Sequence, residues 1–100
     1  MNKLDISKAK SLRGEIVRHL YDLYDMPIPV TKINDLLRYK HFYTKDDIKR
    51  AVGYLAGAKK EFVEIEINDK DYWASFVRLT PVGVNLAEGD TVDKGVVFSE

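Results

Sequence analysis

Residues 77–90, VRLTPVGVNLAEGD, decide the fold because they join a strand to a short helix. Val77 and Leu79 alternate with a charged residue, which is the periodicity of a half-buried strand. Thr80 is a favourable N-cap, and Pro81 suits the first helical position, where its missing N–H would be unsatisfied anyway. A glycine near the end of the stretch is a natural helix stop. We therefore expect a strand that leaves a sheet and enters a short closing helix.

The residues before this join predict a β-hairpin. Residues 61–67, EFVEIEI, alternate between acidic and apolar side chains, and residues 72–79 form the returning strand after a polar turn. With a loop of about five residues, the inward-facing side chains are those of Val63, Ile65, Val77 and Leu79. A shorter turn moves Ala74 and Phe76 inward instead, so the sequence leaves the register open.

A further helix begins after Thr44, with Asp47 placed to complete a capping box. Its buried face holds Ile48, Ala51, Val52 and Leu55. The opposite face holds Asp46, Lys49, Arg50, Gly53, Gly57 and Lys60, with Lys45 on the flank. An exposed glycine costs about 1 kcal/mol relative to alanine, so we interpret the pair as a place where another backbone or a phosphate chain approaches closely. The alternative is that the helix frays after Gly53.

The N-terminal half predicts two helices with an extended segment between them. The first helix runs from about residue 7 to residue 24, and two prolines in residues 25–30 end it and favour a short edge strand. Thr31 then caps the second helix, and residues 39–43 form the next turn. The expected core consists of Leu12, Ile16, Leu20, Ile33, Leu36, Ile48, Val52, Leu55, Val63, Ile65 and Leu79.

Length and composition favour one small globular domain over residues 1–100, with an ordered core at about 7–88 and a C-terminal tail at 89–100. The chain is 45% hydrophobic and 32% charged, which excludes a disordered composition. It has no cysteine, so neither a disulfide nor a thiolate metal site can form. No segment reaches the length of a signal peptide core or a membrane span, and we expect a cytoplasmic protein.

The charge is unevenly distributed although the net charge is zero. Residues 1–50 contain 11 Lys and Arg against 7 Asp and Glu, a net charge of +4, and residues 51–100 contain 5 against 9, a net charge of −4. Such a split can keep one face positive while the molecule stays neutral. It can equally arise by chance in so short a chain.

The order of elements is helix, extended segment, helix, turn, helix, hairpin and closing helix. This order predicts an α+β fold of the winged helix-turn-helix type, with a three-helix core, a two-stranded β-hairpin wing and a short C-terminal helix. In that fold the second strand of the wing returns to the core and leads into the element that closes the domain.

Several short motifs support this fold. They are Leu12-Arg13-Gly14-Glu15-Ile16, Tyr54-Leu55, Leu79-Thr80-Pro81 and Leu86-x-Glu88-Gly89. With them the chain resembles a small family encoded in Mu-like phages and prophages, over a span from about Leu12 to Val96. Residues 93–96 are similar to that family's closing Asp-Pro-Gly-Ile, but Lys94 replaces the proline, so a rigid turn there is not implied. The resemblance implies the fold and carries no established activity.

Our leading hypothesis is a phage or prophage transcriptional regulator that places the third helix in the major groove of double-stranded DNA. The candidate contacts are Lys45, Lys49, Arg50 and Lys60, with Lys40 and Tyr43 in the preceding turn and Lys32 assisting from the second helix. Helix-turn-helix proteins commonly bind as dimers, so we expect a homodimer formed through the first helix or residues 90–98.

The wing favours a different partner. Residues 61–71 carry five carboxylates against Lys70 alone, a net charge of −4, and duplex phosphates repel carboxylates. The alternative hypothesis is therefore a protein-interaction module that uses Tyr72, Trp73 and Phe76 on the wing. Trp73 or Phe76 can instead close one end of the core. We expect no catalytic residue, cofactor or metal, because the two histidines lack a partner at useful spacing and the acidic residues alternate along a strand.

Overall fold

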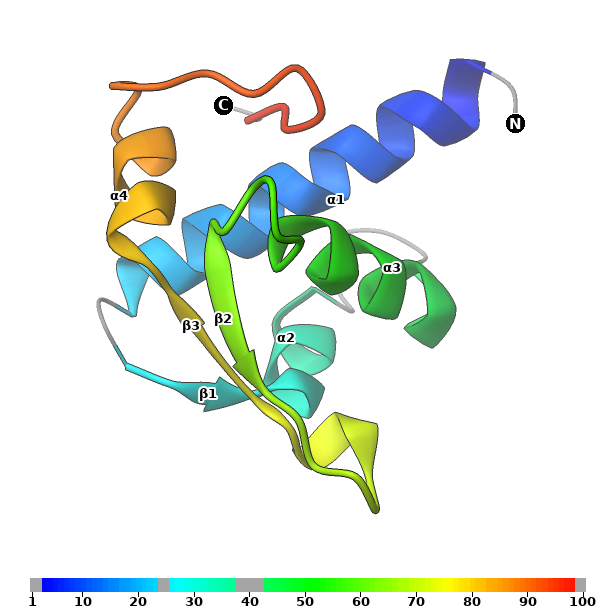
Figure 1. The fold of residues 1–100 in the computed structure, drawn as a ribbon. Helices are drawn as coiled ribbons and strands as arrows, with labels where there is room; N and C mark the ends of the chain where they lie inside the picture. Colours follow the sequence, from blue (N-terminus) through cyan, green and yellow to red (C-terminus); the bar gives the residue numbers. More distant parts are fainter. Residues whose placement is uncertain (1–2, 24–25, 38–42, 99–100) are drawn as a thin grey trace.

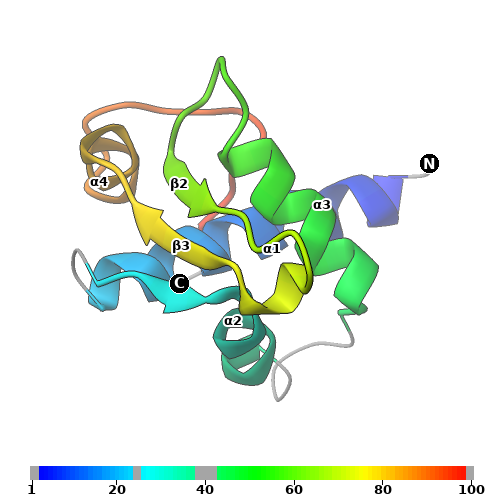
Figure 2. The same cartoon turned by 60° about the horizontal axis from the view of Figure 1, so that its bottom comes forward.

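The computed structural model describes residues 3–23, 26–37 and 43–98 (Figure 1). The elements are α1 (Lys3–Asp22), β1 (Ile28–Pro29), α2 (Val30–Leu37), α3 (Lys45–Leu55), β2 (Val63–Glu66), the 3₁₀ helix η1 (Tyr72–Ala74), β3 (Phe76–Leu79) and α4 (Pro81–Ala87). These residues form an α+β fold with four α-helices and a three-stranded antiparallel sheet. The arrangement is compatible with a winged helix, and the helical part covers one side of the sheet (Figure 2).

The sheet confirms the first of the two hairpin registers. Val63 lies opposite Leu79 and Ile65 lies opposite Val77, while Phe76 points outward and is 47% exposed. The strand order is β1-β3-β2, so the proline-containing segment forms an edge strand, as expected. Its two residues pair with β3 on the side away from β2, Ile28 with Val77 and Pro29 with Phe76.

The connection between β2 and β3 is longer than the expected five residues. It covers residues 67–75, because the first part of the expected return strand forms η1 instead. The Asp71 carboxylate caps η1 by accepting a hydrogen bond from the Trp73 N–H at 3.1 Å. The buried Ser75 hydroxyl accepts one from the Asn68 N–H at 2.9 Å. These side-chain bonds to the backbone replace ladder bonds, which is why residues 72–75 leave the strand.

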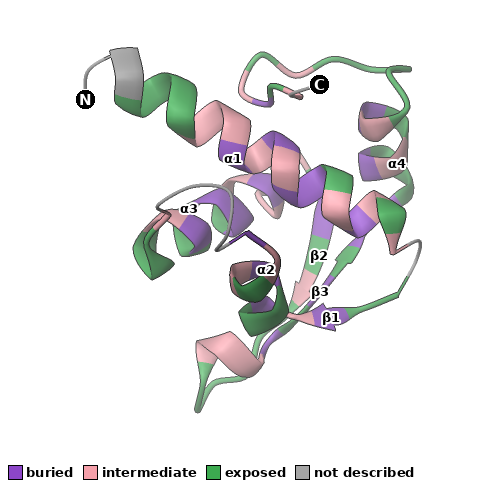
Figure 3. Ribbon diagram, turned by 180° about the vertical axis from the view of Figure 1, so that it is seen from behind, coloured by how far each residue is buried: buried purple, intermediate pink, exposed green. Residues whose placement is uncertain are grey.

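The core contains nearly all the side chains that the sequence places there. Leu36 and Ile65 are the exceptions and are only half-buried. The expectation for Leu36 is wrong because the buried stripe of α2 runs through Val30, Ile33 and Leu37, and Leu36 lies beside it. Thr31 was expected to cap this helix, but α2 begins at Val30, so Thr31 lies inside it. The core also includes Val17, Ile28, Val30, Leu37, Phe62, Val77, Leu86 and Val96. The buried residues of α1 face the other helices and the sheet (Figure 3).

Two expected helix starts are confirmed. At α3 the Thr44 hydroxyl accepts a hydrogen bond from the Asp47 N–H, and the Asp47 carboxylate accepts one from the Thr44 N–H, both at 3.0 Å. At α4 the Thr80 hydroxyl accepts from the Gly83 N–H at 3.0 Å and donates to the Phe62 carbonyl at 3.0 Å. A β-carbon on Gly83 would lie 2.1 Å from that carbonyl, so the strand-to-helix join requires glycine there.

The C-terminal segment, residues 90–98, lies along α1 (Figure 1). The Val97 N–H donates to the Lys10 carbonyl at 3.1 Å, and Val96 is buried in the core. A β-carbon on Gly14 would lie 1.9 Å from the Val97 carbonyl oxygen. The segment therefore packs directly against the backbone of α1 and contributes to the core.

Candidate nucleic-acid interface

The outward face of α3 carries three exposed cations, Lys45, Lys49 and Arg50. The Arg50 guanidinium lies 3.1 Å from the Asp46 carboxylate, and the two side chains are 72% and 66% exposed. An ion pair so exposed contributes little to stability, so Arg50 can exchange Asp46 for another anion at small cost. Further along the same face, none of the described residues outside the adjoining backbone of α3 lies within 4 Å of the place where a β-carbon of Gly53 would be. Packing within this chain therefore does not require that glycine.

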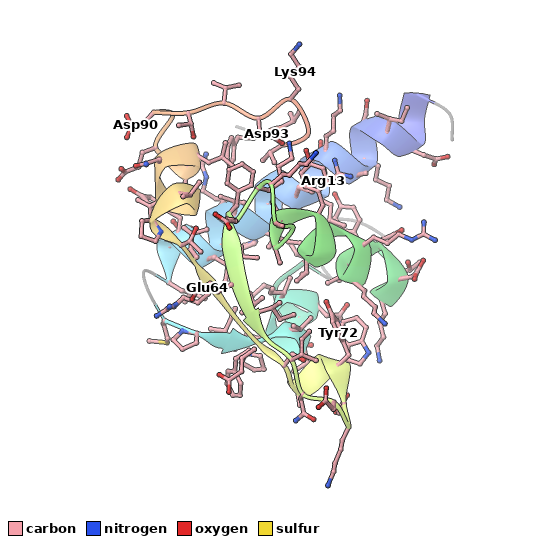
Figure 4. The ribbon with its side chains drawn as sticks, viewed as in Figure 1. Arg13, Glu64, Tyr72, Asp90, Asp93 and Lys94 are labelled. Carbon is pink, nitrogen blue, oxygen red and sulfur yellow. The ribbon has the colours of Figure 1, made fainter. Side chains whose placement is uncertain are left out.

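The aromatic residues of the hairpin loop lie under the lysines of α3. The Lys45 ammonium is 5.4 Å from the centre of the Trp73 ring, and the Lys49 ammonium is 4.9 Å from that of Tyr72. The two rings meet edge to face, with their centres 5.4 Å apart. Figure 4 shows Tyr72 between α3 and the hairpin loop. We call this set, Lys45, Lys49, Tyr72 and Trp73, the α3–loop surface.

The α3–loop surface joins residues from the two functional hypotheses. Lys45 and Lys49 were expected to contact DNA, and Tyr72 and Trp73 were expected to contact a protein partner, yet both pairs form one patch. Phe76 does not belong to it. Its side chain lies on the outer face of the sheet, opposite Pro29 and Glu66 in the strand pairing.

Lys60 does not share the face of α3, contrary to the sequence expectation. The helix ends at Leu55, and residues 56–60 continue in turns that begin with a bond from the Gly57 N–H to the Tyr54 carbonyl. The Lys60 ammonium lies 2.7 Å from the Asp93 carboxylate in the C-terminal segment. That hydrogen bond is the main cause that raises the pKa of Lys60, so this cation is held by a carboxylate of its own chain.

The other candidate contacts precede α3 in the chain. Tyr43 lines a cavity of about 350 Å³ between α1 and α3, where the Lys8 ammonium lies 5.3 Å from its ring centre. Burial raises the pKa of Tyr43 to about 12, with further contributions from Glu15 and Asp47. Tyr43 therefore faces α1 as well as α3. Lys32 is exposed on α2. Lys40 and the expected turn at 39–43, apart from Tyr43, lie outside the described residues.

Asp93 and its neighbours form a second polar cluster, which we call the C-terminal clamp and which consists of Arg13, Tyr54, Lys60, Asp93 and Gly95. The Arg13 guanidinium stacks 3.8 Å from the centre of the Tyr54 ring and donates to the Gly95 carbonyl at 3.0 Å. The Tyr54 hydroxyl donates to Asp93 at 2.7 Å. Figure 4 shows Arg13 and Asp93 reaching the same place between α1 and the C-terminal segment.

The clamp keeps Asp93 ionised. Burial favours the neutral acid, but the hydrogen bonds from Lys60, Tyr54 and the Gly95 N–H outweigh it and lower the pKa of Asp93. Arg13, Tyr54 and Gly95 belong to the short motifs of the sequence, and in the clamp all three make contacts that hold the C-terminal segment. The bonds of the clamp from Arg13, Tyr54 and Lys60 to the C-terminal segment join residues 33 to 82 positions apart in the chain, so no local pattern could have predicted them.

Two of the five acidic side chains of the hairpin have partners within the hairpin. Glu64 forms an ion pair with Arg78 on the exposed side of the sheet, and Asp71 caps η1. The tip of the hairpin, at residues 68–70, points away from α3 (Figure 1).

No protein-family model, curated protein or solved structure matches this chain. Within residues 3–23, 26–37 and 43–98, no helix is both long and apolar enough to cross a membrane. Across the same ranges, no three His, Asp or Glu side chains gather in a way that could hold a metal ion.

Proposed function

We propose that this protein is a winged-helix DNA-binding protein, a transcriptional regulator of the phage and prophage type, that places α3 in the major groove. The observation that carries the proposal is the outward face of α3, where Lys45, Lys49 and Arg50 are exposed and Gly53 leaves the backbone bare. The major groove of B-form DNA admits an α-helix, and lysine and arginine side chains bind phosphates and guanine edges there.

The aromatic rings support this role by orienting the lysines. An exposed cation–π contact contributes about 0.5–1 kcal/mol, enough to bias a lysine side chain toward one direction. Such a contact leaves the ammonium on the open side of the ring, so Lys45 and Lys49 keep donors for phosphate oxygens. Tyr72 and Trp73 then act as positioning residues beside the helix.

The test is a fluorescence-anisotropy titration on labelled mixed-sequence duplex DNA at two salt concentrations. Each cation that neutralises a phosphate adds about one unit to the slope of log affinity against log salt. The double variant Lys49→Glu, Arg50→Glu should therefore lose binding. The matched control, Lys59→Glu with Lys94→Glu, makes the same charge change at exposed positions away from α3 and should bind as wild type within a few-fold. Equal binding by both double variants, or no salt-sensitive binding by wild type, would reject the proposal.

The acidic hairpin gives a further arm to the same titration. Asp69→Lys removes a carboxylate at the exposed hairpin tip without touching the η1 cap, and we expect equal or slightly tighter binding. A loss of affinity in this variant would mean that the tip itself contacts DNA, contrary to the proposed mode.

A second candidate function is the recognition of a protein partner by the same α3–loop surface. The observation in its favour is the contact between Tyr72 and Trp73, because tyrosine and tryptophan are enriched at protein interfaces. Trp73→Ala separates the two functions. For DNA binding it should weaken affinity only slightly and leave the salt slope unchanged, whereas for protein binding it should remove a dominant contact.

A further inference from the structure

The cavity between α1 and α3 has the size and the lining of a site for a small molecule. Its volume of about 350 Å³ lies at the lower end of the range of about 300–1,000 Å³ that ligand pockets occupy. Ala9 and Leu12 from α1 and Ala51 from α3 form what we call its apolar wall. The other described residues of the lining are polar or charged: Asp5, Lys8, Arg13, Tyr43, Asp47 and Arg50. Ligand pockets combine an apolar wall with polar groups that orient the ligand in the same way.

Arg13 brings an unused hydrogen-bond donor to the lining of this cavity. Its Nη1 donates to the Gly95 carbonyl, and its guanidinium stacks on the Tyr54 ring. Its Nε–H is buried, yet none of the described residues accepts a hydrogen bond from it. Buried polar groups are nearly always paired, so this donor indicates an acceptor from outside the chain.

The charge of the lining favours an acceptor that is an anion. Three cations, Lys8, Arg13 and Arg50, line the cavity against two carboxylates. Asp47 is already engaged in the cap of α3, and Asp5 is exposed in the first turn of α1. Because the bond to the C-terminal segment uses Nη1 of Arg13, the edge formed by its Nε and Nη2 matches the two oxygens of a carboxylate.

We propose that this cavity binds a small organic carboxylate, with the apolar part of the ligand against the apolar wall. The carboxylate accepts hydrogen bonds from the Nε edge of Arg13, and Arg50 supplies a second positive charge. The site goes beyond the proposed DNA binding and does not depend on it, because no residue of the α3–loop surface belongs to its lining.

The probes are benzoate, its neutral analogue benzamide, and inorganic phosphate, each titrated into the protein and followed by the NMR shifts of backbone amides. We expect saturable shifts at Ala9 and Ala51 with benzoate, at a Kd that is roughly millimolar for so small a ligand. Benzamide keeps the ring but loses the charge, and phosphate keeps a charge but loses the apolar body. Each should therefore bind at least about tenfold more weakly than benzoate. Equal binding of benzamide would overturn the proposal, and equal binding of phosphate would mean an adventitious ion only.

Three variants test the charged side of the site. Arg13→Lys keeps the positive charge but removes the Nε–H, and it should weaken benzoate binding by about tenfold. Arg50→Gln should weaken it at least about threefold at low salt. Lys49→Gln is the matched control, since it removes the neighbouring cation, which is exposed on α3 but outside the lining. Lys49 is also a proposed DNA contact, so wild-type affinity of this variant for benzoate separates the test from the DNA proposal.

A cavity-filling variant tests the apolar side of the site without changing any charge. Ala9→Leu places a larger side chain in the cavity and should abolish the benzoate shifts, because the apolar body of the ligand loses its space. Ala58→Leu makes the same change at an exposed position past the end of α3 and should bind benzoate as wild type. Leucine is well tolerated in helices, so Ala9→Leu remains informative even if Arg13→Lys disturbs the C-terminal clamp. Unchanged benzoate binding by Ala9→Leu would overturn the proposal, since the ligand would then lie elsewhere.

Discussion

At the scale of single residues, Glu61 has the most unusual backbone. Its φ is +54°, the only positive value at a non-glycine position within the described residues, and it lies where the chain enters β2. A side chain in this region costs about 1–2 kcal/mol, while glycine adopts it freely but loses more entropy on folding. We therefore predict that Glu61→Gly raises the free energy of unfolding by up to about 1 kcal/mol, measured by urea denaturation. Glu61→Ala is the control, because it removes the carboxylate and keeps the strain, and equal gains in both variants would contradict the backbone explanation.

Asp93 gives the second prediction at this scale. Its folded pKa lies below the ordinary value of 3.8, so its contribution to stability is present above that pH and is lost as the pH falls through the lowered pKa. Asp93→Asn should lower the free energy of unfolding by about 1–2 kcal/mol at pH 7, since the lost hydrogen bonds go to a charged acceptor. The difference between variant and wild type should shrink below pH 3.8, and a difference that is the same at pH 3 and pH 7 would mean that the charge is not the cause.

At the scale of elements, α3 is the central support of the candidate interface. Leu55 is fully buried at its end, with Ile48 and Val52 on the same face. Removing a buried leucine side chain leaves a cavity, so Leu55→Ala should cost about 2–5 kcal/mol in urea denaturation. Ala58→Gly, at an exposed position just past the helix, is a control for a small change that leaves no cavity. A cost below 1 kcal/mol for Leu55→Ala, on the order of a surface substitution, would contradict the packing of α3.

The elements also explain what could be predicted from the sequence. The caps at Thr44 and Thr80 and the apolar periodicity of α1 and α3 act between residues close in the chain, so local patterns were sufficient. The sequence analysis missed the η1 turn because the side chains of Asp71 and Ser75 bind backbone groups that a strand would use. The alternation of apolar and polar residues gives no sign of such bonds. The contact of Lys45 and Lys49 with the hairpin aromatics depends on how two separate elements pack, which no local pattern contains.

At the scale of the whole molecule, positive and negative side chains lie on different parts of the surface. Cations gather on the outward face of α3, whereas Glu61, Glu64 and Glu66 lie exposed at the start of β2 and along it. Arg13 and Lys60 are positive but are held in the C-terminal clamp by partners of the same chain. A neutral protein can therefore present a basic surface on one helix.

The last prediction, that of a homodimer, also belongs to the whole molecule. The two surfaces expected to form it, the first helix and residues 90–98, are adjacent, because the Val97 N–H binds the Lys10 carbonyl. Three apolar side chains lie exposed on them: Ile6 at 41%, Val92 at 89% and Val97 at 45%. A symmetric pair of these surfaces would bury such side chains and hold two α3 helices for two half-sites of DNA.

We therefore expect light scattering coupled to size exclusion to give twice the mass of the 11.5 kDa chain at roughly tens of micromolar protein. Val92→Asp with Val97→Asp should shift the mass to that of a monomer, because a carboxylate buried at an interface is costly. Val82→Asp is the matched control, since Val82 is similarly exposed but lies on α4 near the β2 edge. A monomer mass for wild type under these conditions would reject the dimer. In that case all of the affinity for DNA would have to come from one α3 helix.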